Sequence, residues 1–233
     1  MSFQTWSDIG LIPDALYQLA NFDRNNPQSI ANEGSNSNYG TGIFTINDNG
    51  SRNRPNGYSS VNNGRGILLS QNDRFDVATT DIQGTEYTLI VQFSQLKPAI
   101  IGGDFFGIEK GNGDFIKVVS NVPQQYRLNR NTGGSIIAQF NLDNGSDRYQ
   151  SATSNNLNMI AIQRNGAQQM LANINGVQFG PSGTDTNNYS IDGQFFIAGV
   201  EPVVVMSLAF FDQLLTSENI ESIFNNRIGT YGV

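Results

Sequence analysis

The chain has 233 residues, of which 38% are hydrophobic and only 14% are charged, and its formal net charge is −7. It contains no cysteine and no histidine, which excludes disulfides, the Cys-His and Ser-His-Asp nucleophiles, and the usual ligands of zinc, copper and iron. An acidic chain without a basic run is not expected to bind nucleic acid, and none of its apolar runs is long enough to suggest a membrane span.

The N-terminal segment Met1–Asp8 has neither a positively charged region nor an apolar run. We therefore expect no secretory signal peptide, and synthesis in a cytoplasm. No linker-like segment divides the sequence, so residues 1–233 are interpreted as a single domain.

In chain order, the first apolar segment, 15–20, fits either a helix after Pro13 or a strand. A long polar region, 21–65, follows and contains one short predicted strand at 43–46. Further strands are predicted at 66–70, 87–93, 105–108, 115–119, 126–128, 135–140, 195–198 and 203–211. Many short strands separated by glycine-containing turns are typical of a β-sandwich or barrel.

The segment 157–179 predicts a strand, a tight turn, a second strand and another tight turn. Two apolar strands flank Asn165-Gly166, and a second turn follows at Asn175-Gly176. Asn-Gly readily adopts the positive φ angles of a two-residue hairpin turn, so we expect a tight turn at both places.

One helix is predicted near 216–225. Thr216 fits the N-cap position, and Glu218 lies in the first turn, where the helix dipole favours an anion. Ile220, Ile223 and Phe224 fall on one face, which we expect to pack on the sheet.

Several segments resemble, in the same order, the laminin-G-like, concanavalin-A-like lectin and glucanase superfamily. In the C-terminal half these are Met159–Ile162, Asn173–Val177, Phe196–Gly199, Met206–Phe211 and Gln213–Phe224. In the N-terminal half they are the region of Leu16, Asn32–Ser35, Gly66–Leu69, Phe75–Val77 and Tyr87–Phe93. The resemblance implies an all-β fold, a single concanavalin A-like (jelly-roll) β-sandwich with a short C-terminal helix.

The chain departs from the family pattern at three positions. Leu157 or Asn158 replaces a tryptophan, Asn175 replaces the aspartate of an Asp-Gly turn, and Asn219 replaces a glutamate at the start of the last helix. The last change predicts loss of the full capping box.

Glycoside hydrolases of this superfamily carry a Glu-x-Asp-x-x-Glu pattern, whose alternation places the carboxylates on one face of a strand. None of the six glutamates of this chain has that spacing. We therefore expect no glycosidase activity and name no catalytic residue.

Only an all-oxygen Ca²⁺ or Mg²⁺ site remains open to this composition. Asp143–Asp147 resembles a Ca²⁺ loop but lacks the EF-hand register, so a polar turn is favoured. Asp104 and Asp192 are Ca²⁺ candidates that the resemblance implies, although turn roles are favoured for them too. No other cofactor is expected.

Four tyrosines are candidates for ligand binding because they occur among Asn, Ser and Gly in expected loops. They are Tyr39, Tyr58, Tyr149 and Tyr189. An aromatic face beside amides suits a sugar, and it also suits a protein interface.

These features favour a non-enzymatic binding or structural protein. The missing signal peptide, the free-standing domain and the acidic Asn/Gly/Thr-rich surface indicate a virion component of a bacteriophage, by analogy with decoration, tail and fibre proteins. Its partners would be other virion proteins and further copies of itself. The alternative is a lectin module that attaches to host surface glycans.

Overall fold

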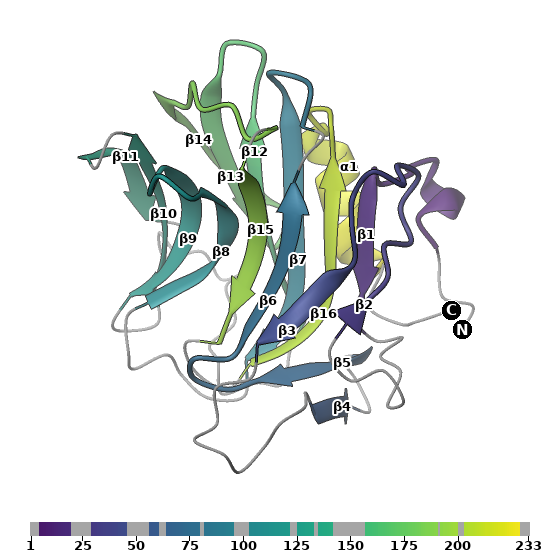
Figure 1. Cartoon of the computed structure of the whole chain (residues 1–233). Helices are drawn as coiled ribbons and strands as arrows, with labels where there is room; N and C mark the ends of the chain where they lie inside the picture. The colour runs from purple at the N-terminus through teal and green to yellow at the C-terminus, as the bar shows by residue number, and fades with distance from the viewer. Residues whose placement is uncertain are drawn as a thin grey trace.

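A computed structural model shows two β-sheets packed face to face, with one short α-helix against the outside of one sheet (Figure 1). The structure describes residues 5–19, 29–45, 56–60, 64–79, 82–95, 103–121, 125–132, 135–141, 157–190, 192–199 and 203–228. The expected all-β sandwich with a short C-terminal helix is therefore confirmed.

Sheet A has eight strands, and β7 and β16 form its centre. In spatial order they are β14 (Val177–Thr184), β13 (Gln169–Ile174), β12 (Leu157–Arg164), β7 (Tyr87–Gln95), β16 (Val203–Phe211), β5 (Gly64–Leu69) and β4 (Asn56–Ser60). The eighth, β1 (Ala15–Gln18), pairs antiparallel with the second half of β16, whose first half pairs with β5. The ambiguous segment near Leu16 is therefore a strand rather than a helix.

Sheet B also has eight strands, and β15 lies between β6 and β8. In spatial order they are β11 (Ser135–Asn141), β10 (Gln125–Thr132), β9 (Phe115–Asn121), β8 (Gly103–Lys110), β15 (Gly193–Ala198), β6 (Arg74–Thr79), β3 (Gly42–Thr45) and β2 (Ser29–Ile30). The central strands β6, β8 and β15 are antiparallel and in continuous register.

The main core lies between the sheets and is rich in aromatic rings. Alternation along β7 directs Tyr87, Leu89, Val91 and Phe93 into it, and all four are essentially inaccessible to solvent. The aromatic members from other strands touch one another, as in the pair Phe195 and Phe210, whose ring centroids are 4.9 Å apart. Such extensive burial stabilises a chain that has no disulfide.

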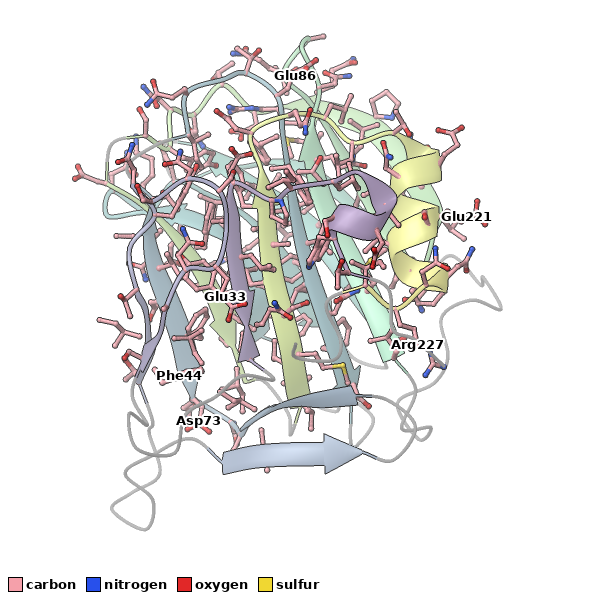
Figure 2. All side chains as sticks on the ribbon, turned by 90° about the vertical axis from the view of Figure 1, so that its right-hand side faces the viewer. Glu33, Phe44, Asp73, Glu86, Glu221 and Arg227 are labelled. Carbon is pink, nitrogen blue, oxygen red and sulfur yellow. The ribbon has the colours of Figure 1, made fainter. Side chains whose placement is uncertain are left out.

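A second apolar cluster covers the outside of sheet A. It joins α1 (Ser217–Asn225) and the 3₁₀ turn η1 (Ser7–Ile9) to that sheet, and Figure 2 shows the two helical segments next to each other. Ile220 and Ile223 are fully buried there, as expected, but Phe224 is only partly buried. Within the described ranges, no helix has the length and apolarity needed to span a bilayer.

The N-terminus of α1 corrects the expectation that Asn219 breaks the capping box. The Thr216 hydroxyl accepts the backbone N–H of Asn219 at 3.2 Å, and Asn219 Oδ1 accepts the backbone N–H of Thr216 at 3.3 Å. An amide oxygen accepts this bond as a carboxylate would, so the box is complete. Glu218 accepts hydrogen bonds from its own backbone N–H and from the Thr216 side chain, and these lower its pKa.

The two Asn-Gly sequences form different turns. Asn175 and Gly176 have φ angles of 51° and 87° and connect Ile174 directly to Val177, which confirms the tight two-residue turn. The expectation of a two-residue turn at Asn165-Gly166 is wrong: residues 165–168 form a longer loop, and Gln168 has the positive φ of 60°. Asn165 Oδ1 closes that loop by accepting the backbone N–H groups of residues 167 and 169.

Candidate functional site

The two outer faces of the sandwich differ in character. Helical segments cover much of the outer face of sheet A, whereas partly exposed charged side chains gather on the outer face of sheet B. Alternation along β6 directs Phe75 and Val77 into the core, so that Arg74 and Asp76 point outward. The same rule turns Gln194 and Phe196 of β15 and Glu109 of β8 to the outside. We call Arg74, Asp76, Glu109, Gln194 and Phe196 the outer-face network.

Arg74 is the centre of the outer-face network. Its Nε donates to Asp76 Oδ1 at 2.6 Å, and one of its terminal nitrogens donates to Glu109 Oε1 from across β15. The Gln194 amide donates to the same Asp76 oxygen at 2.5 Å. The guanidinium carbon lies 4.4 Å from the centroid of the Phe196 ring, which is fully buried beneath it. The polar side chains of the network therefore pack on a buried aromatic ring.

The outer-face network retains unused hydrogen-bonding capacity. The side chains of Arg74, Asp76 and Glu109 are 28%, 25% and 31% exposed. Asp76 Oδ2, Glu109 Oε2 and the Gln194 carbonyl oxygen have no protein partner within the described part of the chain. Because these hydrogen bonds already hold the side chains in place, a ligand would meet acceptors that are oriented in advance.

Further side chains extend the same face on either side. Lys117 on β9 lies 3.8 Å over the Phe115 ring and 2.5 Å from Asp104 Oδ2. On β3, opposite Asp76, Ile43 is 56% exposed. Polar groups alternating with small apolar surfaces match a ligand that presents both hydroxyl groups and C–H faces.

The structure corrects the expected surface location of two tyrosines. Tyr39 is 2% exposed and stacks on Phe195, and Tyr189 is fully buried. Their rings are part of the main core and offer no face to a ligand. Tyr58 lies in β4, and its side chain is outside the described part, as is the whole of Tyr149.

The calcium candidates do not come together in the described residues. Asp104 forms an ion pair with Lys117, and Asp192 lies exposed in a turn with a φ of 54°. The loop Asp143–Asp147 falls outside the described ranges. Across the ranges that are described, no group of three or more Asp or Glu side chains could hold a metal ion.

A second polar cluster lies inside the molecule, around Arg164. Its guanidinium donates to the backbone oxygens of Thr85 at 2.6 Å, Gly84 at 3.0 Å and Asn187 at 2.9 Å. Asp185, which is completely buried, lies 3.5 Å from the same group. The carbonyl groups and Asp185 together use most of the guanidinium's donors, so this cluster joins two loops to β12 and serves a structural role.

Sequence reasoning did not find the outer-face network. Its local signal is the alternating Arg74-Phe75-Asp76-Val77, which indicates a strand with one charged face. Glu109 lies 35 positions from Arg74, and Gln194 lies 118 positions from Asp76. No spacing rule links residues so far apart, because their proximity depends on the order of strands in sheet B.

The chain matches no protein-family model, and no curated sequence is significantly similar to it. Solved structures do resemble it. Domain 4 of AbnA, an extracellular arabinanase from Geobacillus stearothermophilus solved in complex with arabinotriose, matches with a TM-score of 0.61 and 15% identity, over 91% of this chain and 98% of that domain.

Two binding domains match at similar levels. The binding domain of botulinum neurotoxin serotype D gives a TM-score of 0.63 at 12% identity, and that of Paraclostridial Mosquitocidal Protein 1 gives 0.64 at 11%. Each match covers 93% of this chain, which spans about half of those domains, 53% and 52%. The protein therefore has the concanavalin-A-like lectin and glucanase β-sandwich fold.

Proposed function

We propose that the protein is a carbohydrate-binding module that holds its ligand on the outer face of sheet B. The outer-face network is the observation that carries this proposal, because its oriented carboxylate and amide groups lie beside the exposed aliphatic side chain of Ile43. The fold similarity to an arabinanase domain solved with arabinotriose supports the same class of ligand.

Binding would use the unused oxygens described above. Sugar hydroxyls donate to Asp76 Oδ2 and Glu109 Oε2, and hydrogen bonds to charged acceptors are among the stronger ones in proteins. The remaining Arg74 N–H groups donate to ring or hydroxyl oxygens. Ile43 offers apolar surface to C–H faces of the sugar.

We propose that the module is non-enzymatic. Hydrolysis of a glycoside needs one carboxyl group that holds a proton and a second carboxylate across the scissile bond. Asp76 and Glu109 flank Arg74, which donates to both and lies between them. A sugar can rest on this layer, but the guanidinium occupies the position where a glycosidic bond would have to lie.

The virion assignment remains a prediction that no observation on this molecule tests. In that role the module would be a decoration, tail or fibre component, made in a host cytoplasm and carried on a particle in many copies. Because many copies would be arranged symmetrically on one particle, their individually weak saccharide contacts would together give high avidity. Co-sedimentation with purified particles, measured beside glycan binding, separates the virion role from that of a free lectin module.

The proposed function is tested with a glycan array and three forms of the protein. Arg74→Met keeps an apolar side chain packed on Phe196 but removes the donors that orient Asp76 and Glu109. We expect the affinity of this variant for the saccharide to be at least tenfold lower than that of the wild type. Glu221→Gln, on the outward side of α1 (Figure 2), is the control and should bind like the wild type. Absence of saccharide binding by the wild type, or equal binding by Arg74→Met, would refute the proposal.

A further inference from the structure

We infer that the outer-face network selects neutral saccharides with free hydroxyl groups and rejects saccharides that carry carboxylate or sulfate groups. This inference rests on the proposed function, since it specifies which ligands that same face accepts.

The first argument is the balance of charge. Arg74 supplies one positive charge, whereas Asp76 and Glu109 supply two negative charges, so the network has a net charge of −1. The neighbouring Lys117 is matched by Asp104 and adds no net charge. A uronate or sulfate placed on the network would meet an unfavourable local potential, and the chain as a whole, at −7, adds to it.

The second argument concerns hydrogen bonds. The unused atoms Asp76 Oδ2, Glu109 Oε2 and the Gln194 carbonyl oxygen can only accept. A hydroxyl group can donate to each of them, while a carboxylate or sulfate has no proton to donate. Two of the five N–H donors of Arg74 are already directed at protein carboxylates, so its positive charge is already matched and is not left free for an anionic ligand.

The two arguments predict the effect of neutralising the carboxylates. The double variant Asp76→Asn/Glu109→Gln keeps the side-chain shapes and leaves the Arg74 charge unmatched, so the network changes from −1 to +1. Neutral saccharides would then meet neutral amide oxygens in place of the charged carboxylate acceptors. Anionic saccharides would be attracted by the unmatched positive charge of Arg74. The preference of the face should therefore reverse.

Calorimetric titration of the full chain provides the test, with arabinotriose, cellotriose and galactotriose as neutral probes and trigalacturonate as the anionic probe. α-1,4-Linked galactotriose and trigalacturonate differ at C6 alone, which makes them a matched pair. We expect at least one neutral probe to bind, and trigalacturonate to bind at least tenfold more weakly than galactotriose or not at all. In the double variant we expect neutral affinity to fall about tenfold or more and trigalacturonate affinity to rise.

Failure of the inference and failure of the proposed function would give different results in these titrations. Trigalacturonate binding to the wild type as tightly as the neutral probes would overturn the inference and leave carbohydrate binding intact. No binding of any probe or array glycan would overturn the proposed function together with it. Glu221→Gln, which removes one negative charge on the opposite side of the sandwich, must leave the neutral preference unchanged; a shift in that variant would show that overall charge governs selection. Thermal unfolding of each variant confirms that it is folded.

Discussion

Asn175 shows how one side chain can serve a turn and a sheet together. Its φ of 51° begins the turn, its Oδ1 accepts the backbone N–H of Met159 at 2.7 Å, and its Nδ2 donates to Asn158 Oδ1 at 3.0 Å. The residue is 1% exposed. The turn itself could be predicted from Asn-Gly, but the two side-chain bonds could not, because they reach a strand 16 positions away.

The first prediction concerns Asn175→Asp. Aspartate tolerates the same φ and keeps the acceptor for Met159, but it buries a charge and replaces the donor to Asn158 by an oxygen. We expect a loss of about 1–3 kcal/mol of stability at neutral pH, measured by urea unfolding. Asn165→Asp, in the more accessible loop, is the control and should stay within about 0.5 kcal/mol of the wild type. Equal effects at both positions would contradict this account.

The second prediction concerns Tyr17, whose hydroxyl donates to the backbone oxygen of Gly40 at 2.7 Å. Burial raises the pKa of Tyr17 well above its ordinary value of 10.0. As the pH rises, the unfolded chain therefore releases the Tyr17 proton before the folded chain does. The stability that burial of the neutral Tyr17 hydroxyl contributes is complete below pH 10, and it is lost as the pH rises above 10, at up to about 1.4 kcal/mol per pH unit.

Tyr17→Phe should cost about 0.5–1.5 kcal/mol at pH 7. It should also reduce the loss of stability between pH 10 and 11.5, measured by chemical unfolding at each pH. Some alkaline dependence should remain, because burial also raises the pKa of Tyr87. Parallel pH profiles for the wild type and Tyr17→Phe would rule out this role for the hydroxyl.

At the scale of elements, α1 is the part that the sequence predicted most closely. Its N-cap and its apolar face follow from local rules, and the structure confirms Thr216, Ile220 and Ile223 in these roles. The extent of burial of Phe224 does not follow from such rules. A ring at the edge of the apolar face can be fully buried or partly exposed to solvent, and its exposure depends on which elements pack next to the helix.

The third prediction compares two truncations in α1. Ile223→Ala removes a fully buried side chain and should cost about 2–5 kcal/mol. Phe224→Ala removes a ring that is only partly buried and should cost less, about 1 kcal/mol. Urea unfolding of both variants tests the order. A larger loss for Phe224→Ala would mean that its ring contributes more to the packing of α1 than its burial indicates.

Strand prediction succeeded where apolar residues are concentrated and failed where they are not. β7 and β16 carry buried residues on both faces and stand out in the sequence. β4 (Asn56–Ser60) and β14 (Val177–Thr184) are mostly polar or glycine-rich, and pairing with β5 and β13 makes them strands. Pairing with a neighbouring strand, rather than the intrinsic preference of the side chains, therefore determines whether such edge segments form strands.

For the whole molecule, the central contrast is between a face of sheet A covered by helical segments and a face of sheet B on which partly exposed charged side chains of the described residues gather. The sequence resemblance indicated the sandwich, but it could not indicate which tyrosines would be buried or which charges would meet. Tyr39 and Tyr189 occur among polar residues and still lie in the core. The outer-face network forms from β6, β8 and β15 only after the chain has crossed between the sheets.

The central claim is that a saccharide binds on the outer face of sheet B. Its most direct test is an amide chemical-shift titration of the isotope-labelled chain with whichever of arabinotriose, cellotriose and galactotriose binds best. We predict saturable shifts concentrated at Arg74, Asp76, Glu109 and Gln194 on β6, β8 and β15, with α1 unaffected. Shifts confined to α1 or to loops away from sheet B, or no shifts at millimolar saccharide, would contradict it.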